Sequence, residues 1–374
     1  MKKLFWVTFF GLLFAALSHT TSEYDHIRSR YIHKERLFYV LTAITLILFA
    51  GLRTQYNDTD TYVNSYEGIS LSAKEGLMDG IHWLKFGENP GFAFVQRLFR
   101  RWDISTQSFL MIFSAFTIGT NIWFFHKYSC NFFMSVLLFI TFAGFIFNIA
   151  AIKQCTAMAL CLMATDRAIE KKYGQFLLFV FLACLFHAYS FVYLAVPFLA
   201  FRPWGKNTVV LLVVFAFIGL GLQSMLGTLL SVTDMLGEEY DASSFMGEGV
   251  NPIRLLVTAV PIFLSLFTAE IAGREDRAQD IILNATMLNG EIMFIGLFGT
   301  ANYFARLANY FLPLQAVALP RLFSHFDAEG KRAISTSAAV CYMLFFIYSH
   351  SINETFDYAY FSVGLWDYVE SLFA

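Results

Sequence analysis

The sequence predicts an all-α, polytopic integral membrane protein. Hydrophobic residues make up 57% of the 374 residues and charged residues only 14%, against about 25% charged residues in soluble domains. The apolar residues form long runs, and a helix needs about 20 mostly apolar residues to cross a bilayer. Because backbone polar groups must be satisfied within lipid, such runs predict a helical bundle. The net charge of -2 gives no sign of a nucleic-acid partner.

About 12 transmembrane helices are predicted, some of them short or broken. The first apolar run follows Lys2 and Lys3 and could be a secretory signal, but it lacks a small-residue cleavage site, so we interpret it as the first span. No repeat or flexible linker divides the chain, which predicts a single transmembrane domain over residues 1–374. The predicted spans are residues 3–19, 37–52, 107–126, 131–149, 152–168, 174–187, 189–201, 207–230, 253–272, 280–299, 302–323 and 334–350.

Lysine and arginine predict the orientation, since they accumulate in short cytoplasmic loops. Four of these residues lie between residues 28 and 36 and outweigh Lys2 and Lys3, which places this loop inside and the amino terminus outside. The acidic loop at residues 233–249 then falls outside. The other basic residues expected inside are Lys127, Arg167, Lys171, Lys172, Arg202, Lys206, Arg274, Arg277, Lys331 and Arg332.

This orientation requires residues 174–201 to enter the membrane and return. These 28 residues are too few for two full crossings, so we expect two short helices that meet near residues 186–190. Broken helices at membrane depth are tolerated where they line protein or a watery cavity, which points to a functional site.

The segment at residues 53–106 is predicted to be an outer-face loop after the second span. Its second half carries Phe92, Val95, Phe99 and Trp102 at helical spacing. Arginines occupy other positions around the same helix. This pattern predicts an amphipathic helix lying in the membrane interface.

Four ionisable residues lie within or at the head of predicted spans: Lys153, His187, Glu291 and Arg306. A charge at the bilayer centre costs about 2.5–3.5 kcal/mol, so each is a functional candidate. Each also has a structural alternative: Lys153 and Arg306 could extend to the interface, Glu291 could be a protonated core carboxyl, and His187 a hydrogen-bonded core residue. On the predicted helix, the residues at i-4, i+3 and i+7 share a face with Arg306 and give a polar stripe along it. These residues are Asn302, Asn309 and Pro313.

The predicted topology gathers charges in the outer half of the membrane. Cations held beside carboxylates under a low-dielectric rim suit a doubly charged group such as a lipid pyrophosphate, because arginine binds phosphate oxygens through two parallel hydrogen bonds. The sequence has no HExxH, GxxxxGK[ST] or GxSxG motif and no EF-hand spacing, so neither a cofactor nor a metal site is predicted. The gathered residues are Arg53, Asp58, Asp60, Glu88, Lys153, His187 and Arg306.

Five short runs between residues 36 and 315 carry a resemblance: "RTQYNDTDTYVNSY" from Arg53, "ENPGF" from Glu88, "IKQCTAMA" from Ile152, "FHAYS" from Phe186 and "ARLANYF" from Ala305. In this order and spacing the chain resembles the EpsG branch of the Wzy-like polysaccharide polymerases. It departs from the family pattern at Tyr56, where a glycine is expected, at Asn89, which separates Glu88 from Pro90, and at Lys153, which replaces arginine. Lysine keeps the charge but loses the planar fork.

The resemblance implies a multi-pass glycosyltransferase of the bacterial cytoplasmic membrane. Such an enzyme would join oligosaccharide repeat units carried on undecaprenyl pyrophosphate at the outer face, building an exopolysaccharide, capsule or O-antigen-like chain. A chain-length regulator and other export proteins are possible partners. A ligase that transfers finished glycan is one alternative, although the short acidic loop lacks the histidine usual in ligases. A lipid-glycan transporter or flippase is another, although the sequence shows no internal repeat.

Particular residues are expected to act as the base, to stabilise the leaving group and to bind the substrate. We rank His187 first and Asp58 second as the base, and expect Arg306 to stabilise the leaving pyrophosphate. Asp60 and Glu88 remain alternative bases. Tyrosine rings offer flat apolar faces to sugars. The expected substrate-binding residues are Arg53, Asp60, Tyr62, Tyr66, Glu88, Lys153, Gln154, Asn302, Asn309 and Tyr310.

Overall fold

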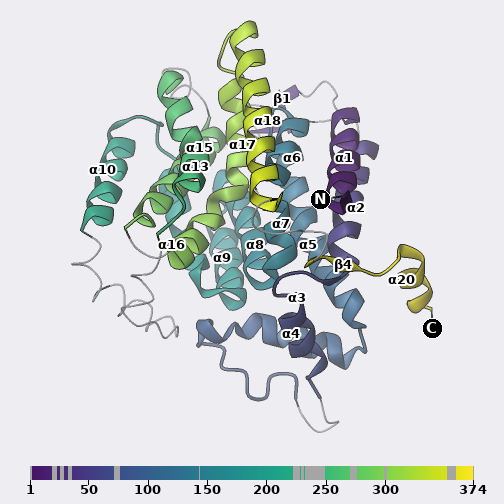
Figure 1. Cartoon of the computed structure of the whole chain (residues 1–374). Helices are drawn as coiled ribbons and strands as arrows, with labels where there is room; N and C mark the ends of the chain where they lie inside the picture. The colour runs from purple at the N-terminus through teal and green to yellow at the C-terminus, as the bar shows by residue number, and fades with distance from the viewer. Residues whose placement is uncertain are drawn as a thin grey trace.

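The computed structural model shows a bundle of helices with a small outer layer at one end (Figure 1). The structure describes residues 2–18, 23–25, 29–32, 36–70, 76–142, 144–221, 228, 231, 249–269, 276–298, 301–351 and 359–373. Most of the acidic loop at residues 233–249 therefore lies outside the described residues, as does Arg274.

Each predicted span coincides with one or more helices. The first half of the bundle contains α1 (Lys2–Leu17), α2 (Leu37–Gly51), α5 (Thr106–Tyr128), α6 (Phe132–Thr141), α7 (Gly144–Ala150), α8 (Ile152–Ile169) and α9 (Tyr173–Phe186). The second half contains η2 (Ala188–Leu199), α10 (Lys206–Leu220), α13 (Pro252–Phe267), α15 (Arg277–Ile295), α16 (Ala301–Ala308), η4 (Asn309–Phe311), α17 (Leu312–Phe323) and α18 (Ala328–Ser351).

The helices differ in whether they can cross a bilayer alone. Among the described residues, α5 and α18 are long and apolar enough, and the bent pair α6 and α7 would make a third span. Shorter apolar helices are α2, α9, η2, α10 and α13. The chain is thus an all-α membrane protein. The number of about 12 membrane crossings stays a prediction.

Two predicted spans are interrupted. Residues 131–149 form α6 and α7, which are bent by 54° relative to each other. Residues 302–323 form α16 and α17 with the 3-10 turn η4 between them. Pro313 stands in the first turn of α17, where its missing N–H is tolerated. The expected polar stripe along one continuous helix is therefore wrong, because Arg306 and Asn309 belong to different elements.

The predicted break at residues 186–190 is confirmed. Helix α9 ends at Phe186, His187 is extended with φ -160° and ψ 115°, and the 3-10 helix η2 begins at Ala188. The two helices pack against each other and against α8.

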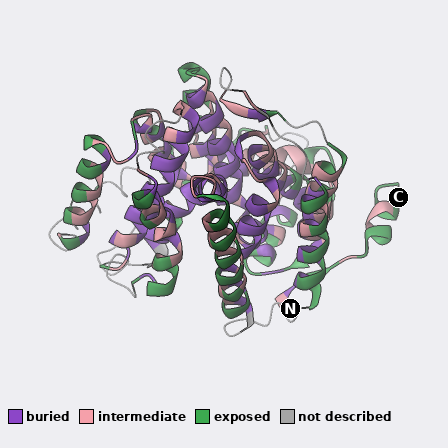
Figure 2. Cartoon of the chain, turned by 90° about the horizontal axis from the view of Figure 1, so that it is seen from above, coloured by how far each residue is buried: buried purple, intermediate pink, exposed green. Residues whose placement is uncertain are grey.

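Buried residues concentrate in the central helices, as Figure 2 shows. Helices at the periphery expose large apolar side chains instead, such as Phe217 on α10 and Leu344 on α18, which are 71% and 60% exposed. Lipid would cover such residues, so this exposure fits a membrane protein.

Two short antiparallel sheets mark opposite ends of the bundle (Figure 1). Strands β1 (Glu23–Asp25) and β2 (Arg30–Ile32) pair near the starts of α9 and α15, which we call the basic end. Strands β3 (Arg53–Gln55) and β4 (Phe361–Ser362) pair at the other end, which we call the outer end. The β1–β2 sheet and the outer loop thus lie at opposite ends of the bundle (Figure 1).

The outer loop is a layer of its own, with α3 (Thr59–Glu67), η1 (Phe86–Glu88) and α4 (Pro90–Arg101). A helix around Phe92 is present as α4, which lies across the end of the bundle (Figure 1), whereas its predicted position in the membrane interface stays a prediction. Its apolar face packs on protein: Phe92 is buried, and Val95 and Phe99 pack against the same cluster. Trp102, just past its end, is 63% exposed.

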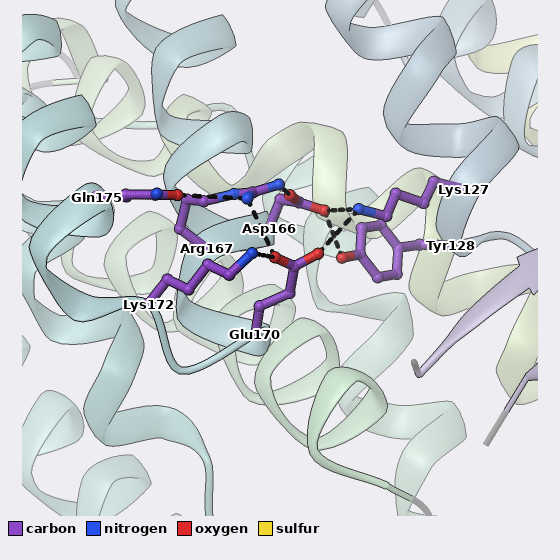
Figure 3. Close-up of polar contacts among 7 residues, drawn as sticks. All are labelled: Lys127, Tyr128, Asp166, Arg167, Glu170, Lys172 and Gln175. Carbon is purple, nitrogen blue, oxygen red and sulfur yellow. Dashed lines mark hydrogen bonds and ion pairs between the residues drawn. The ribbon is translucent and has the colours of Figure 1, made fainter. Parts of the chain in front are cut away.

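A buried carboxylate joins two helices at the basic end (Figure 3). Lys127 at the end of α5 and Arg167 on α8 both form ion pairs with Asp166, whose side chain is fully buried. Tyr128 Oη donates a 2.6 Å hydrogen bond to Asp166 Oδ1. These contacts fix the end of α8 against α5 at the basic end of the bundle.

Glu170 extends this group toward the protein surface. Its Oε2 lies 3.1 Å from Arg167 Nη1 and 2.9 Å from Lys172 Nζ. Partial burial would raise the pKa of Glu170, but the hydrogen bond from Lys172 and the neighbouring cations outweigh it and hold that pKa below its usual range. Glu170 is therefore ionised at neutral pH.

We expect Asp166→Asn to lower the free energy of unfolding by about 3 kcal/mol, because two part-buried cations would lose a buried partner. Thermal melting of the purified protein in one detergent would measure the loss. Glu170→Gln is the matched control, with an expected loss below about 1 kcal/mol, since that carboxylate is 28% exposed. Equal melting of Asp166→Asn and the unmodified protein would contradict this role.

Candidate functional site

The break after α9, the helix η2 and the turn η4 meet around the phenol of Tyr310. Tyr310 Oη lies 2.8 Å from His187 Nδ1 and 3.1 Å from Ser190 Oγ. Ser190 Oγ also donates a 2.7 Å hydrogen bond to the His187 carbonyl, and Tyr193 Oη reaches the Tyr310 carbonyl at 3.3 Å. His187 stands in the break between α9 and η2, and Tyr310 in the break between α16 and α17. The site is thus built where two helices are interrupted.

Two further hydrogen bonds hold the second break in place. Gln154 Nε2, on the first turn of α8, donates to the Arg306 carbonyl at 2.6 Å. Arg254 Nη2, in the first turn of α13, donates to Asn309 Oδ1 at 3.0 Å. Residues from α8, α13 and η2 therefore fix the short segment that carries Arg306, Asn309 and Tyr310.

Two cations act on His187. The charges of Lys153 and Arg306 both influence the His187 imidazole electrostatically. The Lys153 ammonium lies 6.0 Å from the ring centroid of Tyr62 and 5.8 Å from that of Phe92, within cation–π range. Arg306 is exposed. Lys153 and Arg306 are thus within electrostatic reach of His187, and the predicted binding site that they would form stays a prediction.

A cavity of about 330 Å³ lies on the other side of the Asn309 turn. This volume is in the range of small-molecule pockets. Arg254 and Asn309 are among its polar lining residues, together with Tyr56 and Asn57 from the outer loop. The rest of the lining is mainly apolar, from α7, α13, α15, α17 and α18 and from Phe142 just after α6. Arg254 thus lines the same cavity as two residues of the outer loop.

Sequence reasoning missed Arg254, because it is only the second residue of the predicted span at residues 253–272, where a cation can extend to the interface. A signal was present in "NPIR", where Asn251 caps the helix and Pro252 opens it. Arg254 follows on the predicted outer side, where the charge rule disfavours arginine. An arginine kept against that bias is a candidate for a specific role.

The run "ENPGF" fixes the outer layer close to His187. Asn89 has φ 54°, a left-handed conformation that this residue type tolerates, and Pro90 opens α4. A Cβ on Gly91 would lie 2.8 Å from Leu185 Cβ and 3.1 Å from the Leu185 carbonyl. Only glycine therefore lets α4 approach the end of α9, two residues before His187.

Arg53 lies beneath the outer loop rather than on its surface. Its side chain is fully buried and donates hydrogen bonds to the Ala50 carbonyl, to Thr59 Oγ1 at 3.2 Å and to Ser114 Oγ at 3.1 Å. These contacts join the end of α2 to α3 and α5. The structure thus gives Arg53 a supporting position.

The tyrosines of the outer loop have different surroundings. Tyr62 is 8% exposed and lies under Lys153. Tyr66 is fully buried: its ring stacks on Phe109 at 4.4 Å between centroids, and its hydroxyl donates to the Ile104 carbonyl at 2.6 Å. This leaves neither the ring faces nor the hydroxyl of Tyr66 open to a sugar.

The acidic candidates of the outer loop are exposed. Asp58 precedes α3 and Asp60 lies in its first turn. Glu88 accepts from Lys85 Nζ at 3.1 Å, and its other oxygen lies 2.9 Å from His82 Nδ1. The hydrogen bonds with His82 and Lys85 hold the pKa of Glu88 below its usual range, which makes it a weak base.

The two remaining candidates are Glu291 and Asn302. Glu291 is 6% exposed and lines an apolar groove between α10, α13 and α15. Asn302 belongs to α16, but its side chain lies outside the described part. No group of three His, Cys, Asp or Glu residues that could hold a metal ion occurs within the described ranges.

The fold and the site define a helical membrane protein with exposed and cavity-lining cations at its outer end. The model of the EpsG family matches residues 36–362, and the chain belongs to this family. The matched region runs from the start of α2 to the end of β4, so it includes the β3–β4 pair as well as the five sequence runs. Neither the curated proteins nor the solved structures gave a match. The family and the apolar helices support a membrane protein of polysaccharide biosynthesis.

Proposed function

We propose that this chain is a glycosyltransferase that polymerises oligosaccharide repeat units carried on undecaprenyl pyrophosphate. The reaction takes place at the outer face of the cytoplasmic membrane. The observation that carries this proposal is the hydrogen bond of His187 with Tyr310, which joins two helix interruptions. It is supported by the hydrogen bond from Gln154 to the Arg306 carbonyl and by the charges of Lys153 and Arg306 that act on the imidazole. A base beside fixed cations suits transfer from a diphosphate leaving group.

The hydrogen bonds around Tyr310 support His187 as the base. The Ser190 hydroxyl has one proton, and the His187 carbonyl at 2.7 Å can only accept it. Ser190 Oγ lies 3.1 Å from Tyr310 Oη, which lies 2.8 Å from His187 Nδ1. Because the Ser190 proton is taken by the carbonyl, we assign Tyr310 as the donor to Ser190 and His187 Nδ1 as the donor to Tyr310. This order leaves the lone pair on His187 Nε2. The imidazole can therefore accept a proton from a sugar hydroxyl.

In the proposed step, a hydroxyl of the incoming lipid-linked unit attacks the anomeric carbon of the growing chain. A new C–O bond forms there while the bond to the pyrophosphate breaks. The hydroxyl proton passes to His187 Nε2 and then to water. Undecaprenyl pyrophosphate leaves with the electron pair of the broken bond.

The cations stabilise this leaving group. Negative charge grows on the diphosphate as its bond breaks, and preorganised cations lower the energy of that transition state. Arg306 is exposed and can form a planar, two-point contact with phosphate oxygens. Lys153 supplies a second charge. Arg254, on the cavity wall beside Asn309, is placed to bind the second diphosphate or a sugar hydroxyl.

Chain extension by the purified protein tests the proposal. The full chain, placed in lipid nanodiscs without an ion gradient, should convert a lipid-linked repeat unit into a ladder of longer oligosaccharides. Transfer of one preformed glycan to an unrelated acceptor, without a ladder, would indicate a ligase instead. Movement of the intact lipid-linked unit across vesicles, without any new glycosidic bond, would indicate a transporter.

A further inference from the structure

A polar pocket of about 650 Å³ opens at the basic end of the bundle, opposite to His187. Three separate parts of the chain form it: the start of β2 with Ser29 before it, the end of α8 with the turn that follows, and the start of α15. Its lining residues are Ser29, Arg30, Ile169, Glu170, Lys171, Lys172, Asp276 and Arg277.

The walls of this pocket are held by contacts within the protein. Tyr24 on β1 donates a hydrogen bond to Asp276, which also caps the first turn of α15. The Arg277 guanidinium lies 3.3 Å from the Ala168 carbonyl and 3.1 Å from Tyr173 Oη. These contacts join β1 and the end of α8 to the start of α15.

Positive charge exceeds negative charge in the pocket. The described part of its lining has four cations and two carboxylates. The charge of Glu170 is already balanced by Arg167 and Lys172, as Figure 3 shows. Among the contacts of the described residues, none uses the side chain of Arg30 or Lys171. These two cations are therefore available to an anion, and the proposed glycosyl transfer does not involve them.

We propose that this pocket binds the phosphate headgroup of an anionic phospholipid from the cytoplasmic leaflet. Basic pockets between membrane helices on the cytoplasmic side bind such headgroups. Tyr173 joins the pocket wall to the first turn of α9, and Leu177 and Phe181 follow it one and two turns later. These three side chains are 46%, 53% and 51% exposed. Acyl chains can follow this apolar strip while the headgroup stays in the pocket, whereas a soluble anion would not contact it.

Native mass spectrometry of the full chain in detergent tests this site, with phosphatidylglycerol as the anionic probe and phosphatidylcholine as the neutral one. Arg30→Gln combined with Lys171→Gln should weaken phosphatidylglycerol binding about 30-fold, because each basic residue near an anionic headgroup contributes a factor of about five. Phosphatidylcholine binding should not change. The matched control is Lys331→Gln combined with Arg332→Gln, which removes two exposed cations near the start of α18.

Each outcome decides the proposal. Selective loss in the pocket variant, with melting temperature and elution volume unchanged, supports it. Unchanged binding in the pocket variant overturns it, and so does an equal loss in the control, which would show general attraction to a basic surface. Inorganic phosphate forms the third arm: competition as effective as that of phosphatidylglycerol would assign a free anion and overturn the lipid. Binding is measured without turnover, so the result is independent of the proposed glycosyl transfer.

Discussion

Arg306→Ala should lower the rate of chain extension by about 100-fold or more, while the protein remains abundant in the membrane. The rate falls because the leaving diphosphate loses a preorganised cation in the transition state. The folding cost should be small. Arg306 is exposed, and the contact that fixes its segment, from Gln154, uses its backbone carbonyl. Oligosaccharide length in cells and chain extension in nanodiscs would both report the loss.

Two matched variants make the test specific. Arg306→Lys keeps the charge but not the planar fork, so we expect partial activity. Arg332→Ala removes an exposed arginine from the start of α18 at the basic end and should leave chain length unchanged. Normal polymer from Arg306→Ala would end the assignment of Arg306 to the leaving group.

The helices could be predicted from the sequence, and one helix break could as well. Apolar runs locate membrane helices because lipid demands them. The break at His187 followed from chain length, since residues 174–201 could not cross twice as full helices. The break at Asn309 was missed. Pro313 follows it, but a proline does not by itself indicate a break, because it is also tolerated near the start of a helix. Its cause is tertiary: Arg254 and Tyr193 hold the turn, and neither is near it in the sequence.

The candidate site was predicted less completely than the helices. Charges in the predicted outer half of the membrane identified Lys153, His187 and Arg306, because an ionisable group in lipid is costly enough to be informative. The outer loop gave no such signal. Arg53 pairs with Ser362 across a sheet that no local pattern indicates. Within the loop, Tyr66 is buried and has a supporting position, whereas the aspartates are exposed. This difference depends on packing, which residue spacing does not specify.

His187→Gln should lower chain extension by about 10²- to 10⁴-fold, the usual contribution of general acid–base catalysis. Glutamine can still form a hydrogen bond with Tyr310, but its amide cannot accept a proton at neutral pH. Single-turnover rates with a lipid-linked repeat unit in nanodiscs would measure the step directly. Binding of the substrate should change little, since the proposed role of the imidazole is to accept a proton.

Two further variants separate catalysis by His187 from a purely structural role. Tyr310→Phe removes the hydrogen bond to His187 Nδ1 and should lower the rate about 5- to 10-fold, because a single hydrogen bond contributes about 1 kcal/mol. His82→Gln removes an exposed histidine of the outer loop and should not affect the rate. If His187→Gln kept the unmodified rate, or lost activity only in proportion to lost protein, the base would have to be sought at Asp58 or Asp60. A rate loss in folded His187→Gln, with the smaller loss in Tyr310→Phe, is expected only if the oriented imidazole takes the proton.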